Sequence, residues 1–432
     1  MKNLLIKNVR IINPFESPEL IEKGWITIVD DKIDKVGSGT IETSSFDEVL
    51  DMTGKTVLPG MINLHHHLYS SLALGMPAPK KVPGNFTEIL EEVWWKLDLA
   101  LDEESTRASF ESGLLECLRN GVTTIFDHHS SPNYTNGSLE MLVEISDKYG
   151  INISPSFEIT DRNGHEYFES GLKENINTIN KYVNHPYVSP LIGLHASFTI
   201  SDKSLREISN AKGKHGVHIH VSEDLADETD AKNRGYDSVI NRLDEFGLLD
   251  ENSLIAHGIH ISEKDVETIV KNGSSMMHNP TSNANNQVGI LSSNYIERLD
   301  VGLGTDGMQA NLISEAKEGL LIRSSHKIDN IDYLKLLFVN NADISSKLFG
   351  LKLGKIQPGY QADLAFYNYF PRTRLDKGNI LGHILFALGK PTDVISRGKL
   401  RISDGNIVNQ DSETILYNSN KQSKILWKKM TE

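Results

Sequence analysis

Eight short apolar segments alternate with helix-like segments between residues 59 and 350, and this alternation limits the fold more than any other feature of the sequence. Strands that alternate with helices are typical of a parallel sheet covered by helices. Eight such units favour a closed barrel over an open sheet. We therefore predict an α/β fold, a (β/α)8 TIM-like barrel, with strands that end near residues 67, 128, 157, 195, 220, 257, 278 and 305.

The two ends of the chain differ from this middle part and are similar to each other. Short β-rich runs, such as residues 25–29 and 363–367, occur throughout residues 1–58 and 351–432. We expect both ends to build one small β-sandwich domain beside a barrel of residues 59–350. The lysine-rich last residues are expected to form a solvated tail.

The composition excludes several classes of protein. The 432 residues carry a net charge of −14, which argues against a nucleic-acid partner. Cys117 is the only cysteine, so neither an intrachain disulfide nor a thiolate metal cluster can form. No run approaches the ~20 apolar residues of a membrane helix, and the first residues are too polar for a signal peptide. We therefore expect a cytoplasmic enzyme with no membrane partner.

Histidine and aspartate side chains stand where several of these strands end. His65 and His67 close the first strand and point the same way, because alternate side chains on a strand share a face. His220 closes the fifth strand and Asp306 follows the eighth, at the same rim of the barrel. Three imidazoles and a carboxylate suit one divalent metal ion, Zn²⁺ first and Fe²⁺ as the alternative, with a position left open for water.

Further side chains at this rim are candidates for proton transfer. Glu223 lies just beyond His220 and is expected to face the substrate as general acid and base, while Asp306 takes a proton from a metal-activated water. His257, at the end of the sixth strand, could bind the metal but is preferred as a group that polarises the nucleophile or a developing oxyanion. His218 lies one layer deeper than His220, where a structural or supporting role is favoured.

Four other side chains are candidate substrate contacts. His195 ends the fourth strand and is predicted to contact the substrate. His128 and His129 end the second strand, where a substrate or proton-relay role and a structural role remain equally open. Trp94 follows the first strand, and it either closes over the substrate or packs in the core.

Motifs spread over nearly the whole chain resemble the amidohydrolase superfamily, in its branch of mononuclear deaminases and chlorohydrolases. The segments that carry the resemblance are Pro59-Gly60-Met61-Ile62-Asn63, His278-Asn279-Pro280, Leu303-Gly304-Thr305-Asp306-Gly307 and residues 354–364. Within the branch, residues 93–98, 126–132, 220–225 and 282–286 resemble aminohydrolases of the SsnA type. Asn283 lies in the last of these segments and is expected to contact the substrate.

The resemblance implies specific roles for the residues at the rim. It implies that Glu223 and His257 are catalytic, and that the metal ligands are His65, His67, His220 and Asp306. In related barrels a second metal needs a carboxylated lysine on the fourth strand, and residues 190–196 contain no lysine, so we expect one ion. The resemblance also implies a homodimer.

These observations together predict a metal-dependent hydrolase that attacks a carbon–nitrogen bond of a nitrogen heterocycle, a purine-like small molecule. Hydrolytic deamination is the preferred reaction because most of the branch performs it. Opening of a cyclic amide in a purine-derived ring is the alternative, since the same metal, acid and base serve both reactions. A triazine-type chlorohydrolase and a scaffold without catalysis are the remaining hypotheses.

Overall fold

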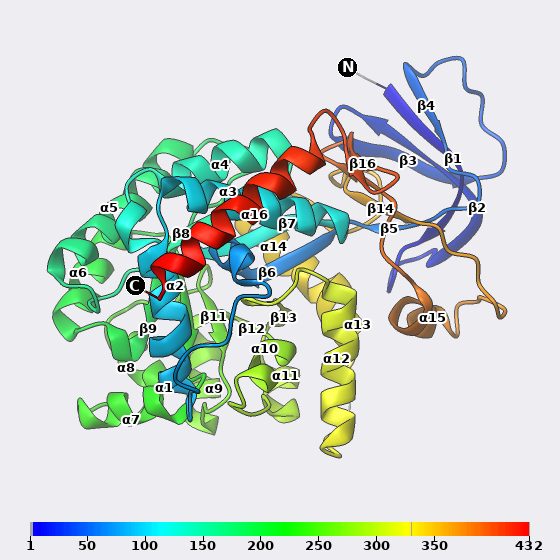
Figure 1. Cartoon of the computed structure of the whole chain (residues 1–432). Coiled ribbons are helices and arrows are strands. Elements are labelled where there is room, and N and C mark those ends of the chain that lie inside the picture. Colours follow the sequence, from blue (N-terminus) through cyan, green and yellow to red (C-terminus); the bar gives the residue numbers. More distant parts are fainter. Residues whose placement is uncertain (1–2, 330, 432) are drawn as a thin grey trace.

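The computed structural model describes residues 3–329 and 331–431, and these form two parts (Figure 1). One end of the molecule is a sheet made of strands from both ends of the chain. The other end contains parallel strands surrounded by helices. The protein is therefore an α/β fold with parallel sheets, as the sequence predicts.

The mixed sheet joins segments that are far apart in the sequence. Its order is β17-β16-β15-β14-β5-β1-β2-β3, and β4 pairs with β1. Leu364 on β14 lies opposite Pro59 on β5, so the two chain ends meet inside the sheet. Buried apolar side chains such as Ile6, Ile28 and Phe366 give the sheet its own small core. The strands are Asn3–Ile12 (β1), Leu20–Val29 (β2), Lys32–Ser38 (β3), Glu48–Asp51 (β4), Thr56–Pro59 (β5), Leu364–Tyr367 (β14), Asp393–Ser396 (β15), Lys399–Ser403 (β16) and Asn406–Ile407 (β17).

The other strands form two parallel sheets, β6-β7-β8 and β13-β12-β11-β10-β9. Every residue in them is buried, as expected for strands covered on both faces. Isolated parallel bridges join His66 to Asp306 and Ile159 to Leu194, at the two seams between the sheets. The predicted strand ends are confirmed: Met61–His66 (β6), Val122–His129 (β7), Asn152–Phe157 (β8), Ile192–Ala196 (β9), Val217–Val221 (β10), Leu254–His257 (β11), Ser275–His278 (β12) and Val301–Leu303 (β13).

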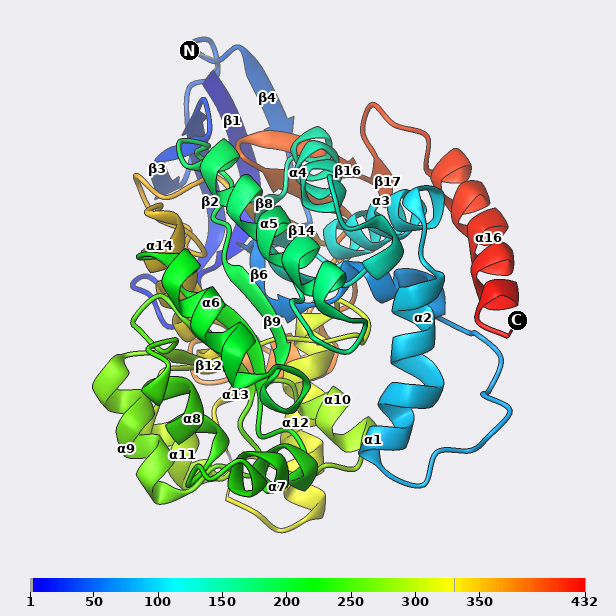
Figure 2. The same cartoon turned by 90° about the vertical axis from the view of Figure 1, so that its left-hand side faces the viewer.

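Helices follow the parallel strands and cover them, as α5 and α6 do in Figure 2. Asp102 caps α3 by accepting a hydrogen bond from the backbone N–H of Ser105. The α-helices are Phe86–Ile89 (α1), Trp95–Ala100 (α2), Glu103–Arg119 (α3), Ser138–Tyr149 (α4), His165–Tyr182 (α5), Asp202–Lys212 (α6), Leu225–Asn233 (α7), Val239–Glu245 (α8), Glu263–Asn272 (α9), Pro280–Asn285 (α10), Ser293–Arg298 (α11), Leu312–Ser325 (α12), Tyr333–Lys335 (α13), Asn341–Phe349 (α14), Ile380–Ala387 (α15) and Ser412–Lys429 (α16). Short 3-10 or π-helical turns are Leu68–Ala73 (η1), Leu90–Trp94 (η2), Pro132–Tyr134 (η3), Ser197–Thr199 (η4) and Leu336–Asn340 (η5).

The last helix corrects one prediction. The sequence predicts a solvated tail here, but α16 lies across α3 and η1 (Figure 1). Leu426 is fully buried, and the indole N–H of Trp427 donates to the backbone oxygen of Leu72 at 2.8 Å. The burial of apolar residues at helical spacing therefore holds this segment in a packed helix, although lysines lie between them.

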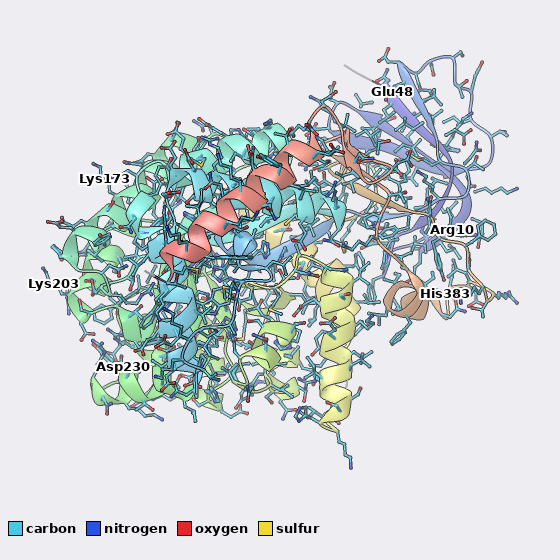
Figure 3. All side chains as sticks on the ribbon, viewed as in Figure 1. Arg10, Glu48, Lys173, Lys203, Asp230 and His383 are labelled. Carbon is cyan, nitrogen blue, oxygen red and sulfur yellow. The ribbon has the colours of Figure 1, made fainter. Side chains whose placement is uncertain are left out.

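The outer surface carries charged side chains. Lys173 on α5, Lys203 on α6 and Asp230 on α7 lie on the outside of the molecule (Figure 3). Among the helices of residues 3–329 and 331–431, none has the length and apolar character needed to cross a membrane.

Candidate functional site

A cavity opens where the parallel strands end. Its floor comes from residues at the ends of β8, β9 and β10 and just after β6 and β13. Its roof comes from residues 86–95, with the apolar side chains Phe86, Leu90 and Trp94. A polar floor under an apolar roof suits a small ring molecule with a few polar groups.

The four side chains predicted to bind a metal meet at this floor. His67 Nε2 lies 2.9 Å from Asp306 Oδ1 and 3.2 Å from His220 Nε2. His65 Nε2 is 3.6 Å from the same oxygen of Asp306. These are the atoms with which imidazole and carboxylate groups bind metal ions.

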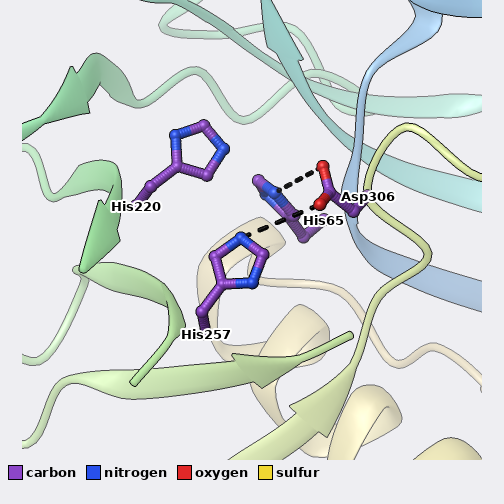
Figure 4. Close-up of side chains that lie close together, drawn as sticks. All are labelled: His65, His220, His257 and Asp306. Carbon is purple, nitrogen blue, oxygen red and sulfur yellow. Dashed lines mark ion pairs between the residues drawn. The ribbon is translucent and has the colours of Figure 1, made fainter. Parts of the chain in front are cut away.

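His257 approaches the same point from β11. Its ligand atom and those of His65, His220 and Asp306 all lie within 4.8 Å of one another (Figure 4). The Nε2 atoms of His65 and His257 are buried and have no hydrogen-bond partner among the described residues. Because buried polar atoms are normally satisfied, two such atoms aimed at one point fit a divalent cation. Imidazole and carboxylate donors suit Zn²⁺ or Fe²⁺.

Glu158 and His128 extend this cluster on one side. Glu158 Oε1 lies 3.2 Å from His128 Nδ1 and 3.6 Å from His67 Nδ1. Burial opposes the charge of Glu158, but the hydrogen bond and charge of His128 hold its pKa well below the usual range. The ligand atoms of His67, His128, Glu158 and His220 form a second set within 4.8 Å. The two sets share His220.

Glu223 follows β10 and lines the cavity beside this cluster. Its Oε2 is 3.5 Å from His257 Nε2, and the amide of Asn286 donates to its Oε1 at 3.2 Å. Burial, opposed by His257 and reinforced by Asp306, raises the pKa of Glu223 to about 7. A carboxyl group that exchanges its proton near neutral pH is suited to general acid and base chemistry.

The backbone is strained at three places around the cavity. His257 has a φ of 75°, and the N–H of Gly258 bonds to the oxygen of Ala256, so His257 is the centre of a rare, strained γ-turn. Ser222 and Asp306 have φ values of 49° and 53°. Such conformations cost about 1–3 kcal/mol each in non-glycine residues and cluster at functional sites.

Two of the predicted substrate contacts line the cavity. His195 lies at the end of β9, with its Nδ1 3.0 Å from the hydroxyl of Thr199. Trp94 is half-buried and reaches both the cavity and the apolar cluster under α16. Trp94 therefore packs in an apolar cluster and also lines the cavity.

Three other predicted contacts lie behind the cavity wall. His128 is fully buried between Glu158 and the backbone oxygen of His218. His129 is fully buried beside Phe110. Asn283 is also buried, and its Oδ1 lies 2.8 Å from His257 Nδ1. The three side chains contact other side chains of the site, and the structure does not place them among the residues that line the cavity.

The structure also shows site residues to which the sequence reasoning assigned no role. Glu158 directly follows the last residue of β8, so the rule that selects polar groups at strand ends could have found it. Ser282 donates to Asp306 Oδ2 at 2.5 Å, and Asn286 contacts Glu223. Both are on or next to a short helix, where spacing alone does not tell which residues face inward.

The residues that line the cavity are strongly acidic. Among the described residues, the lining contains no lysine or arginine. It contains the carboxylates Asp98, Glu158, Glu223, Asp224, Asp227 and Asp306.

Comparison with known proteins agrees with this geometry. The profile of the Amidohydrolase family matches residues 56–401. A 5'-deoxyadenosine deaminase of Methanocaldococcus jannaschii is 28% identical over 98% of this chain and 99% of its own. A 5-methylthioadenosine/S-adenosylhomocysteine deaminase of Thermococcus onnurineus is 28% identical over 95% of both chains. The crystal structure of a Xanthomonas campestris adenosine deaminase with bound zinc has the same fold, with a TM-score of 0.82 and 18% identity over 98% of both chains.

Proposed function

Because the chain belongs to the amidohydrolase family, we propose that it is a metal-dependent hydrolase that deaminates a purine-like heterocycle. The observation that carries this proposal is the convergence of metal-binding atoms beside a protonatable carboxyl group. Asp306 lies within 3.8 Å of three imidazoles, and Glu223 is the next group along the cavity. A metal ion, a base and an acid around one cavity are what hydrolysis of a carbon–nitrogen bond needs.

In this proposal one divalent ion, Zn²⁺ rather than Fe²⁺, is held by His65, His67, His220 and Asp306. The unpartnered, buried Nε2 of His65 supports the assignment. His257 remains beside the metal, where its Nε2 faces both carboxylates. When bound, Zn²⁺ lowers the pKa of a water molecule toward 7 and so supplies a nucleophile at neutral pH.

The protein's own groups then move the protons. Asp306 accepts a proton as the oxygen of water attacks the ring carbon that carries the amine. Glu223 gives its proton to the neighbouring ring nitrogen, and His257 orients the attacking water through its Nε2, which lies beside both carboxylates. The carbon–nitrogen bond breaks when Asp306 passes its proton to the exocyclic amine, which leaves as ammonia. The hydroxyl on the ring carbon gives its remaining proton back to Glu223 and becomes the carbonyl oxygen.

The proposed substrate is an adenosine-like molecule. The deaminases that this chain resembles are named for adenosine derivatives. The side chains of Phe86, Trp94 and Trp95 provide an aromatic roof for a flat base, and His195 offers a polar contact on the wall.

The two parallel sheets are, in this proposal, arcs of one closed barrel of residues 59–350, because parallel bridges join them at both seams. The described parts of residues 1–58 and 351–432 then make the β-sandwich domain, apart from α16, which packs on the barrel helices. A homodimer in the cytoplasm stays a prediction of the sequence.

The experiment is to load the protein with zinc and incubate it with adenosine, 5'-deoxyadenosine and 5-methylthioadenosine. We expect one ammonia per substrate consumed and an intact purine chromophore. A ring-opened product without ammonia would contradict deamination and support cyclic-amide hydrolysis. We expect Glu223→Gln to lower kcat about 10²–10⁴-fold without loss of metal. The matched control is Glu267→Gln, which removes an exposed carboxylate on α9.

A further inference from the structure

One short helical turn contacts three different reacting groups of the site. Ser282 donates to Asp306 Oδ2 at 2.5 Å, and Asn286 donates to Glu223 Oε1 at 3.2 Å. Between them, Asn283 Oδ1 lies 2.8 Å from His257 Nδ1. Ser282 and Asn283 belong to α10, and Asn286 is its C-cap residue. The three side chains are all buried.

We propose that α10 and its cap form a positioning element for the reaction, and that Asn283 selects the tautomer of His257. This inference rests on the proposed function, since it assigns a use to groups of the same site. A neutral imidazole carries one N–H. With Asn283 Oδ1 as its acceptor, that N–H is on Nδ1. The lone pair of Nε2 then faces the reacting groups.

The tautomer of His257 matters because two reacting carboxyl groups lie next to its Nε2. Its Nε2 lies 3.5 Å from Glu223 Oε2 and 3.8 Å from Asp306 Oδ2. An Nε2 with a free lone pair accepts a hydrogen bond from the attacking water and so orients it, whereas an Nε2 that already carries hydrogen only donates. The neighbouring group that orients a histidine thus decides its role, as in hydrolases where exchange of that group leaves the wrong tautomer.

The turn is itself held in place from behind. The backbone N–H of Thr281 donates to Glu315 Oε1 of α12 at 2.9 Å. The backbone N–H groups of Asn283 and Asn286 bond within the turn at 2.9 Å each. A rigid support matters here because His257 and Asp306 both sit on strained backbone with positive φ. Small displacements of groups around a reacting centre cost large factors in rate.

The test compares two replacements of Asn283. Asn283→Leu keeps the size but removes the acceptor, and we expect kcat to fall about 100-fold with KM changed less than threefold. Asn283→Asp keeps an acceptor oxygen, and we expect it to retain kcat within about tenfold of the unchanged protein. Asn180→Leu, at an exposed position of α5, is the control for the substitution itself. Equal losses in Asn283→Leu and Asn283→Asp would overturn the proposal.

A second readout does not depend on turnover. We expect imidazole ¹⁵N chemical shifts to show His257 protonated at Nδ1 in the unchanged protein and in Asn283→Asp, with this preference lost in Asn283→Leu. A proton on Nε2 in the unchanged protein would overturn the inference even if deamination is found. If no heterocycle is deaminated, the proposed function fails, and the ¹⁵N shifts still decide whether Asn283 sets the tautomer.

Discussion

At the scale of single residues, Gly304 packs directly against the backbone and Cβ of His65. A Cβ on Gly304 would lie 2.7 Å from His65 Cβ and 2.8 Å from its backbone oxygen. The same backbone oxygen accepts the N–H groups of Thr305 and Asp306. Gly304 therefore sets the distance between the strand that carries two imidazoles and the carboxylate opposite them.

We predict that Gly304→Ala weakens metal binding at least tenfold and destabilises the protein by about 1–3 kcal/mol, because the methyl group must displace backbone. Zinc titration and urea unfolding measure the two effects. Gly382→Ala is the control, since a Cβ at that position on α15 meets no atom within 4 Å. A zinc affinity of Gly304→Ala equal to that of this control would refute the prediction.

What the sequence could predict for single residues depended on the kind of element that carries them. Alternation along a strand predicts that His65 and His67 point together, and the structure brings both close to Asp306. Asn283 was expected at the substrate and instead contacts His257. Its direction depends on how a short helix packs, which no spacing rule contains.

At the scale of elements, α16 connects the far end of the chain to the roof of the cavity. Trp427 and Leu426 join Tyr69, Leu72 and Trp94 in one apolar cluster. Tyr69 and Trp94 also line the cavity. The helix thus supports the roof from the side that faces away from the substrate.

We predict that Trp427→Ala raises KM about three- to tenfold, because a roof with fewer contacts orders less often over the substrate. Hydrogen exchange should increase in residues 86–100. Tyr417→Ala is the control, since Tyr417 lies on the same helix and is 70% exposed. Unchanged KM and exchange in Trp427→Ala would show that α16 does not support the roof.

The elements themselves were predictable to different degrees. The eight parallel strands are confirmed. They were predictable because short buried apolar runs between helix caps are a strong local signal. The helix α16 was missed because its many lysines obscure the apolar residues at helical spacing. Its hydrogen-bond partners Ala108 and Leu72 are 311 and 355 residues earlier in the chain, where no local pattern indicates them.

At the scale of the whole molecule, the acidic cavity and the net charge of −14 both disfavour the binding of a negatively charged substrate. Among the described lining residues, no lysine or arginine is present to pair with an anionic substrate. We predict that kcat/KM for adenosine 5'-monophosphate is at least about 100-fold below that for adenosine, since like charges brought together cost several kcal/mol. Initial rates of ammonia release with the two substrates measure this ratio. Comparable rates would show that the carboxylates of the cavity do not repel the phosphate group of the bound substrate.

Buried imidazoles also make the fold sensitive to acid. Burial lowers the pKa of His129 to about 3. The unfolded chain gains a proton at this histidine below about pH 6.5 and the folded chain does not, so stability is lost as pH falls from 6.5 toward 3. Between pH 7 and pH 5 the free energy of unfolding falls in the unchanged protein. We predict that it falls by about 2 kcal/mol less in His129→Gln, as measured by urea unfolding. His326 is exposed, so the free energy of unfolding of His326→Gln should fall over this pH range by as much as that of the unchanged protein.

The mixed sheet has a consequence for synthesis on the ribosome. Strands β1 to β5 emerge first and can pair with one another, but the open edge of β5 has no neighbour until β14 is translated. During that interval the whole parallel part of the molecule is made and can fold, while an unpaired edge stays exposed to other nascent chains. Slowing translation between these strands should therefore increase the need for chaperones more than slowing it after β14.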